Sequence, residues 1–133
     1  MNSIPERPTF CALLIDTDVN FRQAVADLLC MCFPLIRVEE ASDGAEAVSK
    51  VDYLRPNIIF TDVELPGKSG FELAKEVKRV YGNIVIVFLA AKTSPEYAFG
   101  NGADCCISKE DDSCIEKILS RIEEAMALSS RSL

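Results

Sequence analysis

Five short apolar runs alternate with amphipathic stretches along the chain, and this alternation constrains the fold more than any other feature. The runs are rich in β-branched residues, which is typical of buried parallel strands. The stretches between them repeat apolar residues at helical spacing. Such alternation predicts right-handed crossovers and a parallel sheet covered by helices on both faces. The runs cover residues 11–15, 36–39, 57–60, 84–89 and 105–107.

The expected fold class is α/β: a flavodoxin-like, doubly wound, five-stranded parallel sheet in the order 2-1-3-4-5. The second run is polar at alternate positions, which predicts an edge strand. A helix start at Ser94-Pro95 is followed closely by Gly100, so the fourth helix should be shortened, to about one or two turns. We expect one domain over residues 10–128, after a lead-in segment at 1–9 and before a tail or linker start at 129–133.

Composition excludes several classes of function. The net charge of −7 argues against direct nucleic-acid binding, which needs lysines and arginines to neutralise phosphates. The longest uninterrupted apolar run, residues 84–91, is far shorter than the ~20 residues of a membrane span. The N-terminus lacks the apolar core of a signal peptide, so we expect a cytoplasmic protein without a membrane association. The six cysteines form no CxxC pair, the chain has no histidine, and we expect reduced thiols.

Charged residues follow three of the expected strands. Asp16 follows the first, Asp62 and Glu64 follow the third, and Lys109 follows the fifth. In the order 2-1-3-4-5, Asp16, Asp62 and Lys109 can converge on one pocket at the carboxyl edge of the sheet. An isolated acid at a strand end is usually a solvated residue or a helix cap, so the joint placement carries the prediction. Crowded carboxylates attract a cation, and oxygen ligands suit Mg²⁺. A carboxylate can accept a phosphoryl group, with Mg²⁺ and a lysine offsetting its charge.

Four segments, taken in order, resemble a response-regulator receiver domain: LLIDTDVNFRQAVADLL, ASDGAEAVSKV, RPNIIFTDVELPGKSGFELAKEVK and GADCCISKE. The third is the most specific, because Leu-Pro-Gly closely follows Asp62. The resemblance covers residues 10–128. It implies a domain of a two-component system that takes a phosphoryl group from a sensor histidine kinase or a phosphotransfer protein, with Mg²⁺. It implies no enzyme activity beyond self-phosphorylation, and it makes a homodimer through the fourth helix, fifth strand and fifth helix a candidate assembly.

The same resemblance implies a role for each residue of the expected pocket. It makes Asp62 the phosphoacceptor and Lys109 the contact of the phosphoryl group. It places Asp16 and Asp62 in an acidic Mg²⁺ site completed by the backbone carbonyl of Glu64. Pro66 and Gly67 would shape the loop after the acceptor.

Four positions depart from the family's pattern. Thr17 stands where the family has a second acid that binds the metal, so either Thr17 or the following Asp18 is a further candidate ligand. Ala90 replaces the threonine or serine that ends the fourth strand, and Cys106 replaces the aromatic ring of the fifth. Glu110 stands where many members have proline. We therefore expect a weak metal site and no Thr-to-aromatic switch, although the acceptor and the lysine are both present.

Two alternatives stay open beside the phosphoacceptor. One is an atypical receiver-like protein-interaction module that acts without phosphorylation. The other is a phosphatase, because Asp16-Thr17-Asp18 resembles the motif that opens haloacid-dehalogenase enzymes. That family expects threonine or valine where this chain has Asn20, and a longer chain with a cap domain. The cognate kinase, the pathway and the output remain open at this stage.

Overall fold

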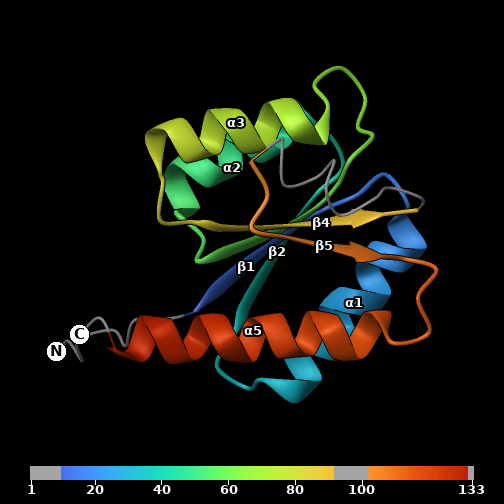
Figure 1. Ribbon diagram of the computed structural model, residues 1–133, viewed down its shortest axis with the longest axis vertical. Coiled ribbons are helices and arrows are strands. Elements are labelled where there is room, and N and C mark those ends of the chain that lie inside the picture. The colour runs from blue at the N-terminus through green and yellow to red at the C-terminus, as the bar shows by residue number, and fades with distance from the viewer. Residues whose placement is uncertain (1–9, 92–101, 132–133) are drawn as a thin grey trace, which may run out of the picture.

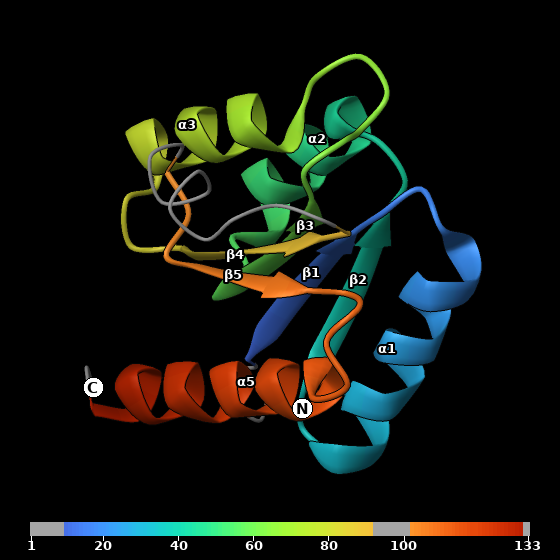
Figure 2. The same cartoon turned by 45° about the vertical axis from the view of Figure 1, so that its right-hand side comes forward.

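The computed structural model describes residues 10–91 and 102–131 and has three layers (Figure 1). A central sheet lies between α1 and α5 on one face and α2 and α3 on the other, and Figure 2 shows both helical layers from a second side. Alternate strand residues point to opposite faces of the sheet, so each strand serves two cores. The layers are those that the alternating sequence pattern predicts.

The sheet is parallel throughout and its strands follow the order β2-β1-β3-β4-β5, which confirms the predicted fold class. β2 lies at one edge, as its alternating polarity indicates, and β5 lies at the other. All carboxyl ends meet at one edge because the strands are parallel. The strands are β1 Cys11–Ile15, β2 Arg37–Ala41, β3 Ile58–Asp62, β4 Val85–Ala90 and β5 Cys105–Ser108.

Polar caps set the starts of three helices. Asp18 and Asp43 accept hydrogen bonds from the first turns of α1 and α2, and Ser69 forms a reciprocal capping box with Glu72 at the start of α3. The short fourth helix expected at residues 94–99 lies outside the described residues. The helices are α1 Val19–Cys32, α2 Gly44–Leu54, α3 Gly70–Val80 and α5 Cys114–Arg131.

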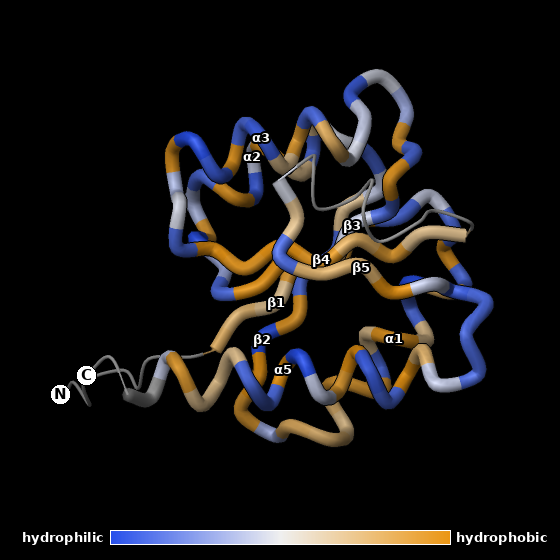
Figure 3. The backbone as a smooth tube through the Cα atoms, in the orientation of Figure 1, coloured by the Kyte–Doolittle hydropathy of each residue, from blue (hydrophilic) through white to orange (hydrophobic). Residues whose placement is uncertain are grey.

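The two cores lie on opposite faces of the sheet, and the apolar strands run between them (Figure 3). Phe60 packs toward α1 and α5, whereas its neighbour Ile59 packs toward α2 and α3. Burial of such a side chain contributes roughly 1.5–3 kcal/mol. Helical spacing of apolar residues places Ala45 and Ile115 among the inward-facing residues of α2 and α5, but Ala47 rather than Ala45 is buried in α2, and Ile115 of α5 is exposed.

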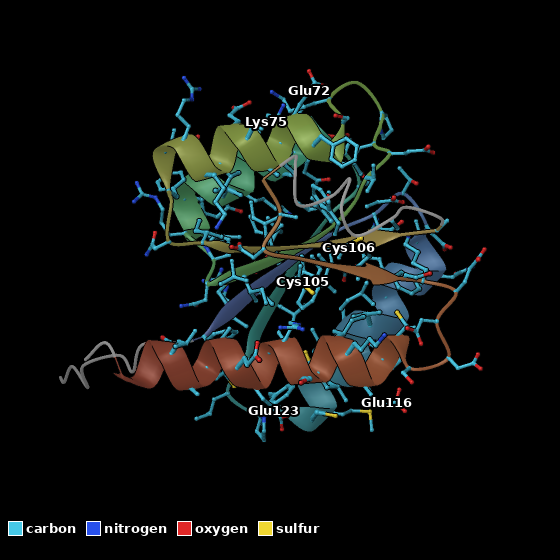
Figure 4. All side chains as sticks on the ribbon, in the orientation of Figure 1. Glu72, Lys75, Cys105, Cys106, Glu116 and Glu123 are labelled. Atoms are coloured by element: carbon cyan, nitrogen blue, oxygen red, sulfur yellow. The ribbon has the colours of Figure 1, made fainter. Side chains whose placement is uncertain are left out.

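Every cysteine of the chain lies in the described part, and all six are free, which agrees with reduced thiols. Cys105 and Cys106 are adjacent on β5, and they face opposite cores, as strand geometry requires (Figure 4). Within residues 10–91 and 102–131, no helix has the length and apolarity to cross a bilayer.

Candidate phosphoacceptor site

Three charged side chains meet at the carboxyl edge of the sheet, as the sequence predicts. The Nζ atom of Lys109, which follows β5, lies 2.6 Å from Oδ2 of Asp16 and 3.0 Å from Oδ2 of Asp62. Asp16 directly follows β1 and Asp62 ends β3. The ammonium group therefore bridges two carboxylates that would otherwise repel each other.

Asp16 is the most deeply buried member of the site, with a side chain only 3% exposed. Its Oδ1 atom accepts a hydrogen bond of 2.9 Å from the backbone N–H of Asp18. Its Oδ2 atom accepts none from the described residues, and its close contact there is the ion pair with Lys109. A buried carboxylate needs such a counter-charge, so Asp16 and Lys109 hold each other in place.

Asp62 is more accessible than Asp16, with 18% of its side chain exposed. Its Oδ1 atom accepts a 3.2 Å hydrogen bond from the N–H of Glu64, while its Oδ2 atom faces Lys109. The preceding residue, Thr61, is fully buried and donates its hydroxyl to the carbonyl of Asp62 at 3.0 Å. The arrangement leaves a carboxylate that is fixed in direction and still reachable from solvent.

The loop after Asp62 turns back on itself and closes at Gly70, the first residue of α3. The N–H of Gly70 donates to the carbonyl of Val63 at 2.7 Å. A Cβ atom at position 70 would lie 2.2 Å from the carbonyl oxygen of Asp62, so only glycine fits there. Gly67 has φ +77°, which agrees with the predicted role of Gly67 in shaping this loop. The need for glycine at position 70 was not predicted, because a close approach between distant backbone atoms leaves no local signal.

The surroundings of Lys109 favour its protonated, positively charged form. Burial lowers the pKa of Lys109, but the nearby carboxylates of Asp16 and Asp62 outweigh that effect, and the pKa is raised above its ordinary value. The ring of Phe21, in α1, lies under the ammonium group, with its centroid 5.0 Å from Nζ. Helical periodicity predicts that Phe21 faces the core, but it gives no information about contact with a distant lysine.

The donor atoms here suit a hard cation, but they are few. Asp16 and Asp62 supply carboxylates, and Asp16 Oδ2 is a buried oxygen that accepts no hydrogen bond from the described residues. Thr17 is exposed, and Asp18 Oδ1 caps α1 by accepting a 3.1 Å hydrogen bond from Phe21 N–H. No group of three or more acidic, cysteine or histidine side chains with metal-binding geometry occurs in the described segments. The two carboxylates therefore suit Mg²⁺, and the weakness of the site stays a prediction from Thr17.

The two switch positions carry neither a hydroxyl group nor an aromatic ring. Ala90 ends β4, is 1% exposed, and its carbonyl accepts a 2.9 Å hydrogen bond from Lys109 N–H. Cys106 is half-buried, and burial raises the pKa of its thiol. Its register partner on β4 is Phe88, whose ring meets that of Phe71 edge-on at 5.1 Å between centroids.

Comparison with known families agrees with this geometry. The family model described as response regulator receiver domain matches residues 12–123. The chain belongs to this family and is a receiver domain of a two-component response regulator. The match runs from β1 into α5 and includes Asp16, Asp62 and Lys109. It is a match to a different family from the haloacid dehalogenases, so it gives no support to the phosphatase alternative.

Individual relatives agree with this family assignment. It is 30% identical over 93 residues to an uncharacterized response regulatory protein of Vibrio cholerae, covering 70% of this chain and 34% of that protein. It is 25% identical over 96 residues to a protein-glutamate methylesterase/protein-glutamine glutaminase of Bacillus subtilis, covering 72% and 25%. The chain thus spans about a third or less of these relatives' length.

Solved structures give the same result. The chemotaxis response regulator CheY4 of Vibrio cholerae superposes with a TM-score of 0.76 at 30% identity, over 86% of this chain and 99% of that one. A signal receiver domain of an HD domain-containing protein from Pseudomonas fluorescens has a TM-score of 0.81 at 17% identity, over 93% and 99%. The second likeness shows the fold alone.

Proposed function

We propose that this receiver domain accepts a phosphoryl group on Asp62 from a sensor histidine kinase or a phosphotransfer protein. The observation that carries the proposal is the bridge of Lys109 Nζ between Asp62 at 3.0 Å and Asp16 at 2.6 Å. The bridge puts a cation beside the more exposed carboxylate, next to the place where the oxygens of a transferred phosphoryl group would carry negative charge. The deeply buried Asp16 keeps that cation in place.

The transfer would proceed by attack of an Asp62 carboxylate oxygen on phosphorus. The P–N bond to a donor phosphohistidine breaks, its electron pair returns to the imidazole, and an acyl phosphate forms on Asp62. Lys109, already protonated, offsets charge on the phosphoryl oxygens. When bound, Mg²⁺ supplies further positive charge, held by Asp16, Asp62 and the carbonyl of Glu64.

The test is phosphorylation by a small donor, because no cognate kinase is needed. The protein is treated with acetyl phosphate and Mg²⁺, and its intact mass is recorded. The wild type should gain one phosphate and Asp62→Asn none. Asp111→Asn is the matched control, since Asp111 also pairs with a lysine, Lys117, but on the exposed surface. Labelling of Asp62→Asn at the wild-type level contradicts the assignment.

A second candidate is a receiver-like module that binds partners without phosphorylation. The observation that favours it is the loss of the acid at Thr17, the hydroxyl at Ala90 and the ring at Cys106, while the fold and the core remain. Absence of any mass increase in the wild type, with Mg²⁺ raised to tens of millimolar, would favour this candidate. In either case the partners are proteins, and a homodimer through β5, α5 and the segment before β5 is one arrangement to test by ultracentrifugation.

The location and the output are also proposals. A cytoplasmic domain agrees with the acidic composition and the reduced thiols. Relatives that are much longer than this chain carry other functions in their names, such as methylesterase or DNA-binding transcriptional activator. The domain itself would then be a regulatory unit rather than an enzyme, and expression of the full reading frame would show what it regulates.

A further inference from the structure

Arg22 of α1 lies beside the site, and none of the roles described so far uses it. Its Nη1 atom donates to the main-chain carbonyl of Asp16. Its Nε atom donates to Oε1 of Glu40, on β2, at 2.8 Å. The side chain is only 12% exposed. One planar guanidinium group therefore links α1, β2 and the residue after β1.

Asp16 needs such a link because it lies just beyond the last paired residues of β1 and β2. The register of β1 with β2 ends at the pair Ile15 and Ala41, and the N–H of Asp16 makes one last bond to Ala41, at 3.1 Å. The carbonyl of Asp16 lies past this bond, where Arg22 is its recorded donor. A displacement of the Asp16 main chain would move its carboxylate too, because the side chain is attached to the same Cα.

Arg22 affects Asp16 through the position of its hydrogen bonds more than through its charge. Glu40 neutralises Arg22 at 2.8 Å, so the pair adds little net field at the pocket. Glu40 is itself held, because Lys50 of α2 donates to its carbonyl. The anchor at the far end of the guanidinium is therefore fixed.

We infer that Arg22 is a positioning residue: its guanidinium fixes the main chain of Asp16 and so directs the Asp16 carboxylate toward Lys109. The consequence for phosphoryl transfer rests on the proposed function, but the effect on Lys109 does not. Lys109 would lose its deeper anchor when Arg22 is removed, and the pocket would lose its alignment with Asp62. Misplacement of a catalytic group by about 1 Å can lower a rate by roughly a hundredfold.

The test compares Arg22→Met with Arg37→Met in the full chain. Arg37 also forms an arginine–glutamate pair on β2, with Glu39 at 3.1 Å, but its side chain is 55% exposed, and Arg37 pairs with Cys11 at the end of β1 opposite Asp16. Two readouts are taken: the NMR signal of the Lys109 ammonium group, which a firm ion pair keeps visible, and the rate of labelling by acetyl phosphate. Thermal unfolding is recorded for each variant.

Arg22→Met should broaden or abolish the Lys109 signal and slow labelling by about tenfold or more, whereas Arg37→Met should resemble the wild type. Glu40→Gln keeps an oxygen for Arg22 Nε and should preserve the Lys109 signal. A lowered melting temperature in Arg22→Met with an unchanged Lys109 signal overturns the inference and leaves Arg22 a structural residue. If the wild type takes no phosphate, the proposed function fails, while the Lys109 signal still decides the role of Arg22.

Discussion

Two neighbouring regions at the carboxyl edge of the sheet differ in what their side chains can do. We call Asp16, Asp62 and Lys109 the acceptor corner, and Ala90 and Cys106 the switch positions. In the acceptor corner, a lysine lies within 3.0 Å of both carboxylates. At the switch positions, Ala90 carries a methyl group and Cys106 a thiol. Neither position has the hydroxyl or the aromatic ring that would move in response to a new phosphoryl group.

The two regions bear on two different steps: the acceptor corner on the uptake of a phosphoryl group, and the switch positions on the structural response to it. Under the proposed function, the acceptor corner would perform the first step with charges that are already in place. A response needs a second state that the phosphoryl group stabilises more than the first. One direct link between the two regions is the main-chain hydrogen bond from Lys109 N–H to the carbonyl of Ala90, at 2.9 Å. We therefore expect substitutions in the acceptor corner to act strongly, and phosphorylation to reach the switch positions weakly.

Lys109→Met should have the largest effect. The substitution leaves the buried carboxylate of Asp16, 3% exposed, without its counter-charge. We expect the free energy of unfolding in urea to fall by about 2 kcal/mol, because a buried ion loses its partner. Phosphorylation by acetyl phosphate should fall below detection by intact mass. Wild-type labelling in Lys109→Met would mean that the acceptor corner does not depend on the lysine.

The pH dependence sharpens this prediction. The folded-state pKa of Lys109 is raised above the ordinary 10.5. The contribution of Lys109 to the stability of the fold is therefore fully present below pH 10.5, and it is lost as the pH rises through the raised pKa. The stability difference between wild type and Lys109→Met should be constant near neutrality and shrink only in strong alkali. Lys117→Met removes an exposed lysine–aspartate pair and should leave the urea midpoint unchanged.

Thr17→Asp should have a smaller effect on the same region. It restores a negative charge beside Asp16. Because Mg²⁺ carries two charges, one carboxylate at about 4 Å in a watery site corresponds to about 2 kcal/mol, which screening by ~0.1 M salt reduces to roughly a tenfold gain in Mg²⁺ affinity. Asp18 cannot give the same gain without releasing its hydrogen bond to Phe21 N–H at the start of α1. Calorimetric titration with Mg²⁺ measures the change, and Thr17→Asn is the uncharged control. Equal affinities for wild type and Thr17→Asp would show that another group already fills the position.

The sequence predicts the acceptor corner better than its supports, for a physical reason. Strand order and the position of charges after strands are enough to bring Asp16, Asp62 and Lys109 together, because parallel strands end at one edge. The contacts of Phe21 with Lys109 and of Arg22 with Asp16 depend on how α1 rolls against the sheet. Helical periodicity gives the buried face of a helix but not its residue-by-residue partners, as the exposed Ile115 also shows.

The smallest expected effect lies at the switch positions, where beryllofluoride, a stable mimic of the phosphoryl group, should change little. Amide exchange should slow after Asp16 and Asp62 but stay unchanged along β4 and around Cys106, because Ala90 has no hydroxyl to be drawn in. The double variant Ala90→Thr with Cys106→Tyr supplies a hydroxyl and a ring. Position 90 is 1% exposed, so overpacking should cost roughly 1–3 kcal/mol. If the double variant gains protection in β4 and β5 with beryllofluoride and the wild type does not, the two regions are separable. Strong new protection of β4 and β5 in the wild type would show that a switch operates without either group.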